Sequence, residues 1–420
     1  MRDSDEETGL ELTPAPSRAS QRGLDWFTFF VANLQTGFGP FLAVYLTTQK
    51  WTQVDIGLVL SIGAIAGLLC QMPGGWAVDA ARSKRRIAIV AVGCIGLAAL
   101  LIALFPVFAM IVMAKLLHVG GSSVVGPAIA AITLGLVGHA ALSQRLSRNA
   151  RFAAIGNGLA AGLMGACGHF VSAQAVFLVT AALVIPTLLA ISRIPEEEID
   201  PVRADGGIAA KDGAGASGAL SIARFLRTPV LLVFAACIML FHVANAAMLP
   251  LVGSDMTTRS GEWATAFVAA CIVGPQLVVA LISTRVGKLA LRWGRRPVLL
   301  LGFSVLPLRG ALLASTNDPT MIVAVQMLDG LSGAVFGIVV PLILADISRG
   351  TGRFNFAQGL AGSAVGIGAA LSTTAAGYLA DHFGMVTAFW GLTATGVAGL
   401  FLVLAAMPET KPKTEPLRRS

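Results

Sequence analysis

The sequence predicts an all-α membrane protein whose twelve transmembrane helices form two pseudo-symmetric six-helix bundles. Composition is the first observation behind this prediction: 55% of the 420 residues are hydrophobic and 12% are charged, against roughly 25% charged residues in a soluble domain. The second is a series of long apolar runs, and the third is a pair of related basic segments, one in each half of the chain. A soluble fold could not bury this much apolar surface.

The apolar runs divide the chain into five regions. A polar, acidic stretch predicts a cytoplasmic N-terminal tail at 1–22, because it lacks the apolar core of a signal peptide. Six runs predict an N-terminal six-helix bundle at 23–193, and a charged, Gly- and Ala-rich stretch predicts a solvated cytoplasmic linker at 194–228. Six further runs predict a C-terminal six-helix bundle at 229–407, followed by a cytoplasmic C-terminal tail at 408–420.

Each apolar run is expected to form one transmembrane helix. Most runs contain the roughly 20 residues that cross a hydrocarbon core of about 30 Å, and the longer ones can tilt or bend. The runs lie near 24–47, 54–78, 87–105, 107–137, 153–172, 175–193, 229–252, 263–284, 297–315, 319–345, 356–380 and 386–406.

The distribution of basic residues predicts the orientation in the membrane. When alternate loops are assigned to one side, 26 of the 30 Lys and Arg residues fall on that side, which the positive-inside rule makes cytoplasmic. We therefore expect a multi-pass protein of the plasma (inner) membrane with both termini in the cytoplasm. The net charge of +8 reflects this topology and contact with the anionic lipid bilayer, not nucleic acid. The five cysteines lie within apolar runs without metal-binding spacing, so no metal or other cofactor is expected.

The two basic segments each predict a cytoplasmic hairpin between two membrane helices. The first reads Gly75-Trp-Ala-Val-Asp79-Ala-Ala-Arg82-Ser-Lys84-Arg85-Arg86. The second begins 212 residues later and reads Gly287-Lys-Leu-Ala-Leu-Arg292-Trp-Gly294-Arg295-Arg296-Pro297. The candidate functional residues of these segments are Gly75, Asp79, Lys84, Arg85, Gly287, Arg292, Gly294, Arg295 and Arg296.

The repeat continues into the helices, where His118–Gly126 can be aligned with Asp329–Gly337. With its paired segments and long middle linker, the chain resembles the major facilitator superfamily over its whole length. The resemblance implies two bundles that rock around a central site, with Asp79 pairing with nearby basic residues and with the start of the eleventh helix. That pairing would latch the cytoplasmic side. Because Leu291 replaces the acidic residue in the second segment, we expect no second latch.

Ionisable residues within the apolar runs are the strongest candidates for a functional site, because isolated charges there cost several kcal/mol. Counting at 1.5 Å per residue places Arg309 and Asp329 at similar depth, so we expect a buried ion pair. It could be a structural tie or a gating or proton-linked pair. Lys115 and His118 lie one turn apart on one helix face, and with Asp25 they complete the candidates for proton exchange. For His118 the alternative is a hydrogen-bonded packing residue, and for Asp25 an interfacial cap.

Polar residues on the helices that line the cavity in the resembled family are candidates for substrate contact. Gln35 and Asn245 each precede a proline by five residues, which predicts similar depth in the two halves. The alternative for this group is hydrogen bonding between helices. The substrate-cavity candidates are Asn33, Gln35, His242, Asn245, Asn157 and Gln358.

These features predict a secondary active transporter that moves a small-molecule substrate by alternating access. Motifs of the HxxH, DxxxD, GxSxG and P-loop types are absent from the sequence, so we expect no enzymatic activity. Proton-coupled efflux of a metabolite, siderophore or drug-like compound is favoured, with protons as the coupling ion and a monomer as the functional unit. The alternative is proton-coupled uptake of a small nutrient or organic acid, and a polytopic membrane enzyme or a receptor is more remote. Lys115 and Arg309 against Asp329 sum to +1, which favours neutral or acidic substrates.

Overall fold

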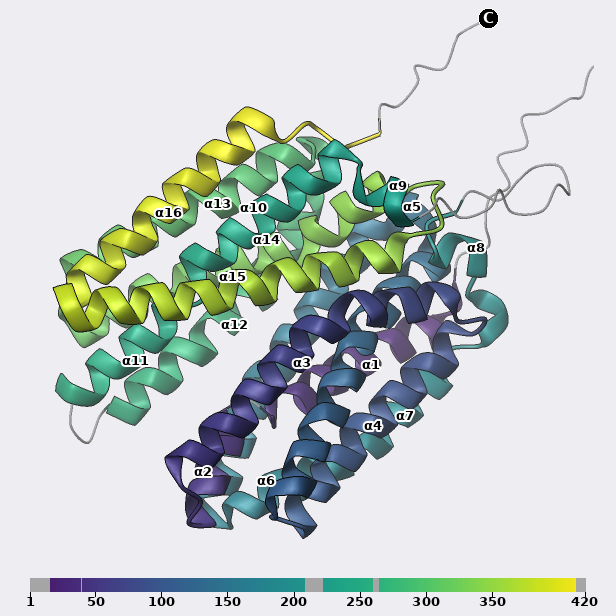
Figure 1. Cartoon of the computed structure of the whole chain (residues 1–420). Coiled ribbons are helices and arrows are strands. Elements are labelled where there is room, and N and C mark those ends of the chain that lie inside the picture. The colour runs from purple at the N-terminus through teal and green to yellow at the C-terminus, as the bar shows by residue number, and fades with distance from the viewer. Residues whose placement is uncertain (1–15, 39, 208–221, 260–263, 413–420) are drawn as a thin grey trace, which may run out of the picture.

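The computed structural model describes residues 16–38, 40–207, 222–259 and 264–412, and the described residues form helices and loops without a strand. Figure 1 shows two bundles side by side, one from each half of the chain. The first half contains α1 (Arg18–Thr36), α2 (Pro40–Thr48), α3 (Gln53–Ala80), α4 (Lys84–Leu104), α5 (Phe108–Phe170), α6 (Ala173–Ala182) and α7 (Val184–Ser192).

The second half begins after a short helical linker. The linker contains the 3-10 turn η1 (Glu196–Glu198), α8 (Pro201–Ala204) and α9 (Ile222–Leu226). The second bundle contains α10 (Pro229–Asn245), α11 (Met248–Arg259), α12 (Ala264–Arg292), α13 (Arg295–Ser315), α14 (Pro319–Ile347), α15 (Phe354–Phe383) and α16 (Met385–Ala406).

The helix count depends on how α5 is divided. Among the described residues, 11 helical segments are long and apolar enough to cross a membrane, and the one at Phe108–Gly168 contains 61 residues. At 1.5 Å per residue it would extend about 90 Å, roughly three times the hydrocarbon thickness. Gly138 interrupts it with φ 62°, a left-handed conformation that glycine adopts without strain. We therefore treat α5 as a first arm (108–137) and a second arm (139–170), each long enough to cross.

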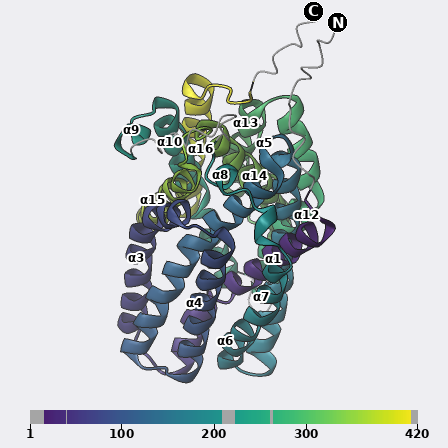
Figure 2. The same ribbon diagram turned by 90° about the vertical axis from the view of Figure 1, so that its right-hand side faces the viewer.

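Both bundles approach one another most closely at one end of the molecule. We call it the linker end, because α8 and α9 lie there (Figures 1 and 2). The opposite end carries α2 and α11 (Figure 1). Glycines allow the approach: a methyl group on Gly75 of α3 would lie 2.2 Å from the carbonyl oxygen of Asn355 in α15. Likewise, a methyl group on Gly359 would lie 2.3 Å from the carbonyl oxygen of Gln71. The backbones of α3 and α15 thus touch without intervening side chains.

The start of the first helix and the burial of the linker differ from the expectation. The first helix starts at Arg18, inside the expected N-terminal tail, because the side chain of Ser17 caps it by accepting the Ser20 amide. The linker was expected to be solvated, but Ile199 and Ala204 are buried, with 6% and 0% of their surface exposed. Apolar residues within the acidic stretch pack against α5 and explain this difference. Linker residues 208–221, and tail residues 1–15 and 413–420, lie outside the described part of the chain.

Candidate functional site

The carboxylate of Asp79 joins the two bundles at the linker end. It lies in the last turn of α3 and accepts the backbone amides of Asn355 at 3.0 Å and Phe356 at 2.8 Å. It also accepts the side-chain amide of Asn355 at 2.9 Å. These are first-turn amides of α15, which have no partner inside their helix and favour a negative charge. A side chain of the first bundle therefore caps a helix of the second, and we call this contact the Asp79 cap.

Lys84, the first residue of α4, lies buried beside the Asp79 cap. Its Nζ atom lies 2.6 Å from the carboxylate of Asp205 in the linker. The same atom donates to the carbonyls of Val78 at 2.7 Å and Ala81 at 2.8 Å, which are exposed acceptors at the end of α3. Burial raises the pKa of Asp205, and the neighbouring Lys84 ammonium opposes this rise. Arg85 is half-buried and makes no comparable contact among the described residues.

The second basic segment forms its contacts within its own bundle. Arg295, the first residue of α13, is buried and pairs with Asp346 of α14, with Nε at 2.9 Å from the carboxylate. Glu409, after α16, accepts the amides of Arg295 at 2.8 Å and Arg296 at 3.1 Å. These amides follow Gly294, whose φ is 103°. The side chain of Arg292 is exposed, so it does not join this network.

One contact of the second segment does cross between the bundles. The carbonyl of Gly287 in α12 accepts the hydroxyl of Ser143 in the second arm of α5 at 2.9 Å. A methyl group on Gly287 would lie 1.8 Å from Oγ of Ser147. This contact is a neutral hydrogen bond, in contrast to the charged Asp79 cap.

Within the second bundle, Arg309 and Asp329 are in contact. The guanidinium of Arg309, with 1% of the residue exposed, bonds to the carboxylate of Asp329. It also donates to Oδ1 of Asn245 at 2.7 Å and to Oε1 of Gln326 at 2.9 Å. A buried guanidinium needs such a complete set of acceptors. The side chain of Asp329 is 33% exposed, so the pair has one open side.

A neutral polar cluster lies within the first bundle. Nε2 of His118 lies 3.2 Å from Oε1 of Gln35, which also accepts the Ser122 hydroxyl at 3.0 Å. The Phe38 ring stacks on the imidazole, with centroids 3.8 Å apart. Nδ1 of His118 is buried and has no partner among the described residues. One turn away, Lys115 packs against Gly63, and in the described ranges no carboxylate lies within ion-pair distance of it.

The remaining cavity candidates differ in their hydrogen-bond partners. Asn33 donates to the carbonyl of Phe29 in its own helix at 2.8 Å. Asn157 accepts the Thr36 hydroxyl at 3.2 Å, and Nδ1 of His242 lies 3.0 Å from the carbonyl of Ile238. The buried side-chain nitrogen of Gln358 has no partner in the described part of the chain.

Asp25 lies in a second charged cluster, at the linker end of α1. It bonds to Arg145, with Nη2 at 2.6 Å, and to Arg148. Both arginines belong to the second arm of α5. Arg145 and Asp25 are buried, so Asp25, which was a candidate for proton exchange or an interfacial cap, lies in an ion-pair network that ties α1 to α5.

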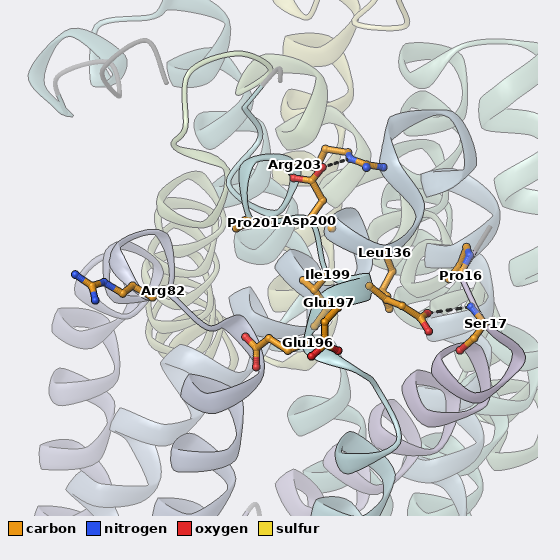
Figure 3. A pocket seen from close by; sticks show the side chains of 12 residues that line it. Pro16, Ser17, Arg82, Leu136, Glu196, Glu197, Ile199, Asp200, Pro201 and Arg203 are labelled. Carbon is orange, nitrogen blue, oxygen red and sulfur yellow. Dashed lines mark hydrogen bonds and ion pairs between the residues drawn. The ribbon is translucent and has the colours of Figure 1, made fainter. Parts of the chain in front are cut away.

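A cavity of about 670 Å³ opens at the linker end between η1, α5 and the start of α1. Figure 3 shows the acidic residues Glu196 and Glu197 on one side and Arg82 on the other. The carboxylate of Asp200 pairs with Nε of Arg203 at 2.7 Å beside it. Within the described ranges, no group of three or more His, Cys, Asp or Glu residues could hold a metal ion.

Several members of these clusters were not among the sequence candidates. Gln326 lies three residues before Asp329 and Ser122 lies four residues after His118, so helical spacing from known candidates would have found them. Asp205 and Glu409 gave no such signal, because both lie outside the apolar runs.

Comparison with known proteins identifies relatives along the whole chain. The family model of the Major Facilitator Superfamily matches residues 25–288 and 263–420. An uncharacterized MFS-type transporter of Mycobacterium tuberculosis is 38% identical over 403 residues, which cover 95% of each chain. The tetracenomycin C resistance and export protein of Streptomyces glaucescens is 32% identical over 143 residues, 33% of this chain and 26% of that protein.

Two solved structures share the fold. A crystal structure of the nucleoside transporter NupG has a TM-score of 0.64 and 18% identity, covering 92% of this chain and 100% of the other. The human organic anion transporter MFSD10 has a TM-score of 0.69 and 13% identity, covering 92% and 99%. At these identities the likeness establishes the arrangement of the helices alone.

Proposed function

The chain belongs to the Major Facilitator Superfamily, and we propose that it is a secondary active transporter that moves a small organic solute by alternating access, with efflux driven by proton exchange. We place the linker end in the cytoplasm, because 26 of the 30 basic residues were assigned to that side. The inner membrane is the corresponding location.

The observation that carries this proposal is the Asp79 cap. It is a charged contact between the two bundles, and it joins the end of α3 to the start of α15. Such a contact can break and re-form as the bundles rock, without unsatisfied groups being buried, because water replaces the partners on opening. The bundles are joined there at the linker end, which corresponds to a cytoplasm-closed state in the proposed orientation.

The charges within the bundles support an acidic or neutral solute. Arg309 is neutralised by Asp329, whereas Lys115 has no carboxylate partner among the described residues. An ammonium without a counter-ion in an apolar setting attracts an anionic group and repels an organic cation. The local similarity to an antibiotic export protein supports the outward direction.

His118 and Lys115 are our candidates for the proton-carrying groups. Within the described part of the chain, Nδ1 of His118 has no hydrogen-bond partner and Lys115 has no carboxylate partner, so proton exchange at either group would break no ion pair. Arg309 and Asp329, in contrast, form an ion pair, which a change of protonation would break.

Two experiments test this function in sequence. Metabolites inside and outside a deletion strain are compared with those of a strain that overproduces the protein, which identifies a solute and its direction. Efflux predicts that the deletion strain retains the solute, and uptake predicts that it leaves more of it outside. Proteoliposomes containing only this protein are then loaded with that solute and given a pH gradient.

We expect the gradient to drive accumulation by the unaltered protein and not by the Lys115→Met/His118→Gln double variant, which should still exchange solute down its own gradient. His382→Gln is the matched control, because that histidine is exposed near the end of α15 opposite the linker. If the double variant still accumulates solute, helix α5 is not the coupling element. If no solute moves in either system, the transport proposal itself is wrong.

A further inference from the structure

The first part of the linker, residues 199–207, runs between the two bundles and bonds to both. On the first bundle, the amide of Asp200 donates to the carbonyl of Gly135 at 3.3 Å. On the second bundle, the amide of Phe354 donates to the carbonyl of Asp205 at 3.1 Å, and the amide of Gly350 donates to that of Gly206 at 2.6 Å. This segment is therefore part of the contact between the bundles.

The internal repeat explains why the linker is needed there. The leading glycines and Asp79 align with the second segment by a shift of 212 residues, but the second segment is one residue shorter before its next helix, so from there on the shift is 211, as for His118 and Asp329. This shift of 211 aligns Lys84 with Arg295, and each of these cations is the first residue of its helix. The same shift aligns Gly135 with Asp346, the carboxylate that pairs with Arg295. The first bundle thus has a buried cation, Lys84, at the linker end. At the position that aligns with the counter-ion Asp346 it has Gly135, which has no side chain.

The linker fills the space that the missing side chain leaves. A methyl group on Gly135 would lie 2.8 Å from Cγ2 of Ile199 and 3.1 Å from the carbonyl oxygen of Asp200. The glycine therefore lets the linker lie directly on α5, and Asp205 then reaches Lys84 at 2.6 Å. A carboxylate from outside the bundle takes the position that a carboxylate of α14 occupies in the second half.

Asp205 also lies beside the Asp79 cap. The side-chain amide nitrogen of Asn355, which donates to Asp79, is 3.1 Å from the carbonyl of Ala204 and 3.4 Å from the carboxylate of Asp205. Lys84, held by Asp205, binds the carbonyls at the end of α3, the helix that carries Asp79. Asp205 thus contacts one group on each side of the cap.

We propose that Asp205 is a positioning residue for closure of the linker end, which sets Lys84 and Asn355 so that Asp79 can cap α15. This inference deepens the proposed transport function, but its test needs no transported solute. Without the Asp205 charge, Lys84 loses its counter-ion in a buried site and the end of α3 is no longer fixed. The bundles should then separate more readily at the linker end.

The test measures distances by pulsed electron paramagnetic resonance in the purified full-length protein. Spin labels are placed on the exposed positions Arg86 of the first bundle and Arg349 of the second, in a background in which the five cysteines are replaced. Asp205→Asn should raise the ratio of separated to closed linker ends by about tenfold, the usual effect of losing a charged hydrogen bond. Asp205→Glu should restore the unaltered distribution.

Asp200→Asn is the matched control, because that carboxylate pairs only with Arg203 inside the linker among the described residues. Should Asp205→Asn fail to fold, Lys84→Met/Asp205→Asn removes the stranded charge. That double variant should fold, and it should still show the separated distance, because nothing then fixes the end of α3.

The proposal is overturned if Asp205→Asn lowers thermal stability but leaves the distances as they are in Asp200→Asn. It is equally overturned if the folded double variant keeps the closed distance. A shifted distance in a protein that transports no solute would sink the transport function and leave this inference intact.

Discussion

The two basic segments are similar in sequence and form different connections in the folded protein. In the first segment Asp79 leaves its own bundle and caps α15. In the second segment the corresponding position is Leu291, which is exposed. The carboxylates near it are Asp346, which pairs with Arg295, and Glu409, which caps α13, and both belong to the same bundle as the segment. Each of the two helices that follow a basic segment begins with a buried cation, Lys84 or Arg295, whereas the anionic partners come from different parts of the chain.

The middle of the bundles shows a similar contrast. The repeat aligns His118 with Asp329, yet His118 lies in a neutral cluster and Asp329 pairs with Arg309. The second half thus holds a charge pair, and the first half holds His118, whose Nδ1 has no hydrogen-bond partner among the described residues. We expect stability to depend most on the second bundle at this level, and coupling on the first.

The largest effect is expected from breaking the buried pair. Asp329→Ala leaves Arg309 buried without its counter-ion, which should cost about 3–5 kcal/mol. Removing both charges in Arg309→Leu/Asp329→Ala should cost less, because no charge remains to be solvated. Thermal unfolding of the purified variants measures this, with His118→Ala as the comparison at the aligned position of the first half.

If the losses in free energy of unfolding of the two single variants added up in the double variant, Arg309 and Asp329 would act independently. If His118→Ala destabilised the protein as strongly as Asp329→Ala, stability would not depend more on the second bundle than on the first at this level.

A smaller effect is expected from the Asp79 cap. Asp79→Asn keeps one acceptor oxygen but removes the charge, so the closed linker end should lose about 1.5 kcal/mol, or about tenfold in population. Leu291→Asn at the corresponding place of the second segment should leave the population unchanged. Labelling of a cysteine introduced at the linker end reports the open fraction in each variant.

Equal labelling of Asp79→Asn and the unaltered protein would mean that the glycine contact between α3 and α15 alone holds the ends together. An effect of Leu291→Asn as large as that of Asp79→Asn would show that the two segments are equivalent after all.

The helices and the repeat could be predicted because both depend on local patterns. Apolar runs long enough to cross a bilayer leave few alternatives to helices, and the basic segments mark equivalent turns. Arg309 and Asp329 were expected to pair because each counts to the same depth along its own helix. Depth along a helix is set by the sequence alone, so this reasoning works within the membrane.

The linker contacts could not be predicted in the same way. Asp205 lies in a polar stretch whose composition indicates solvent exposure. It reaches Lys84 because the preceding linker residues pack on Gly135, a position without a side chain in another helix. Likewise, Glu409 lies in the predicted C-terminal tail at 408–420, and Asn355 lies just before the predicted helix at 356–380. Contacts of this kind depend on how separate elements meet, which no spacing within one element encodes.

The smallest effect is expected at the starts of α4 and α13, the helices that follow the two basic segments, because these helices are capped differently. Glu409 caps α13 by its charge, whereas α4 is capped locally by the hydroxyl of Ser83, which accepts the Arg86 amide at 3.0 Å. Glu409→Gln removes the charge but keeps an acceptor, so the start of α13 should lose about 0.5 kcal/mol, typical of a charge near a helix N-terminus. Hydrogen exchange of the Arg295 and Arg296 amides should quicken about twofold, because local opening sets their rate.

Ser83→Ala should instead quicken exchange at the start of α4 and leave α13 unchanged. If Glu409→Gln quickened exchange in both helices, the tail would stabilise the whole linker end, and the starts of α4 and α13 would be coupled rather than separately capped.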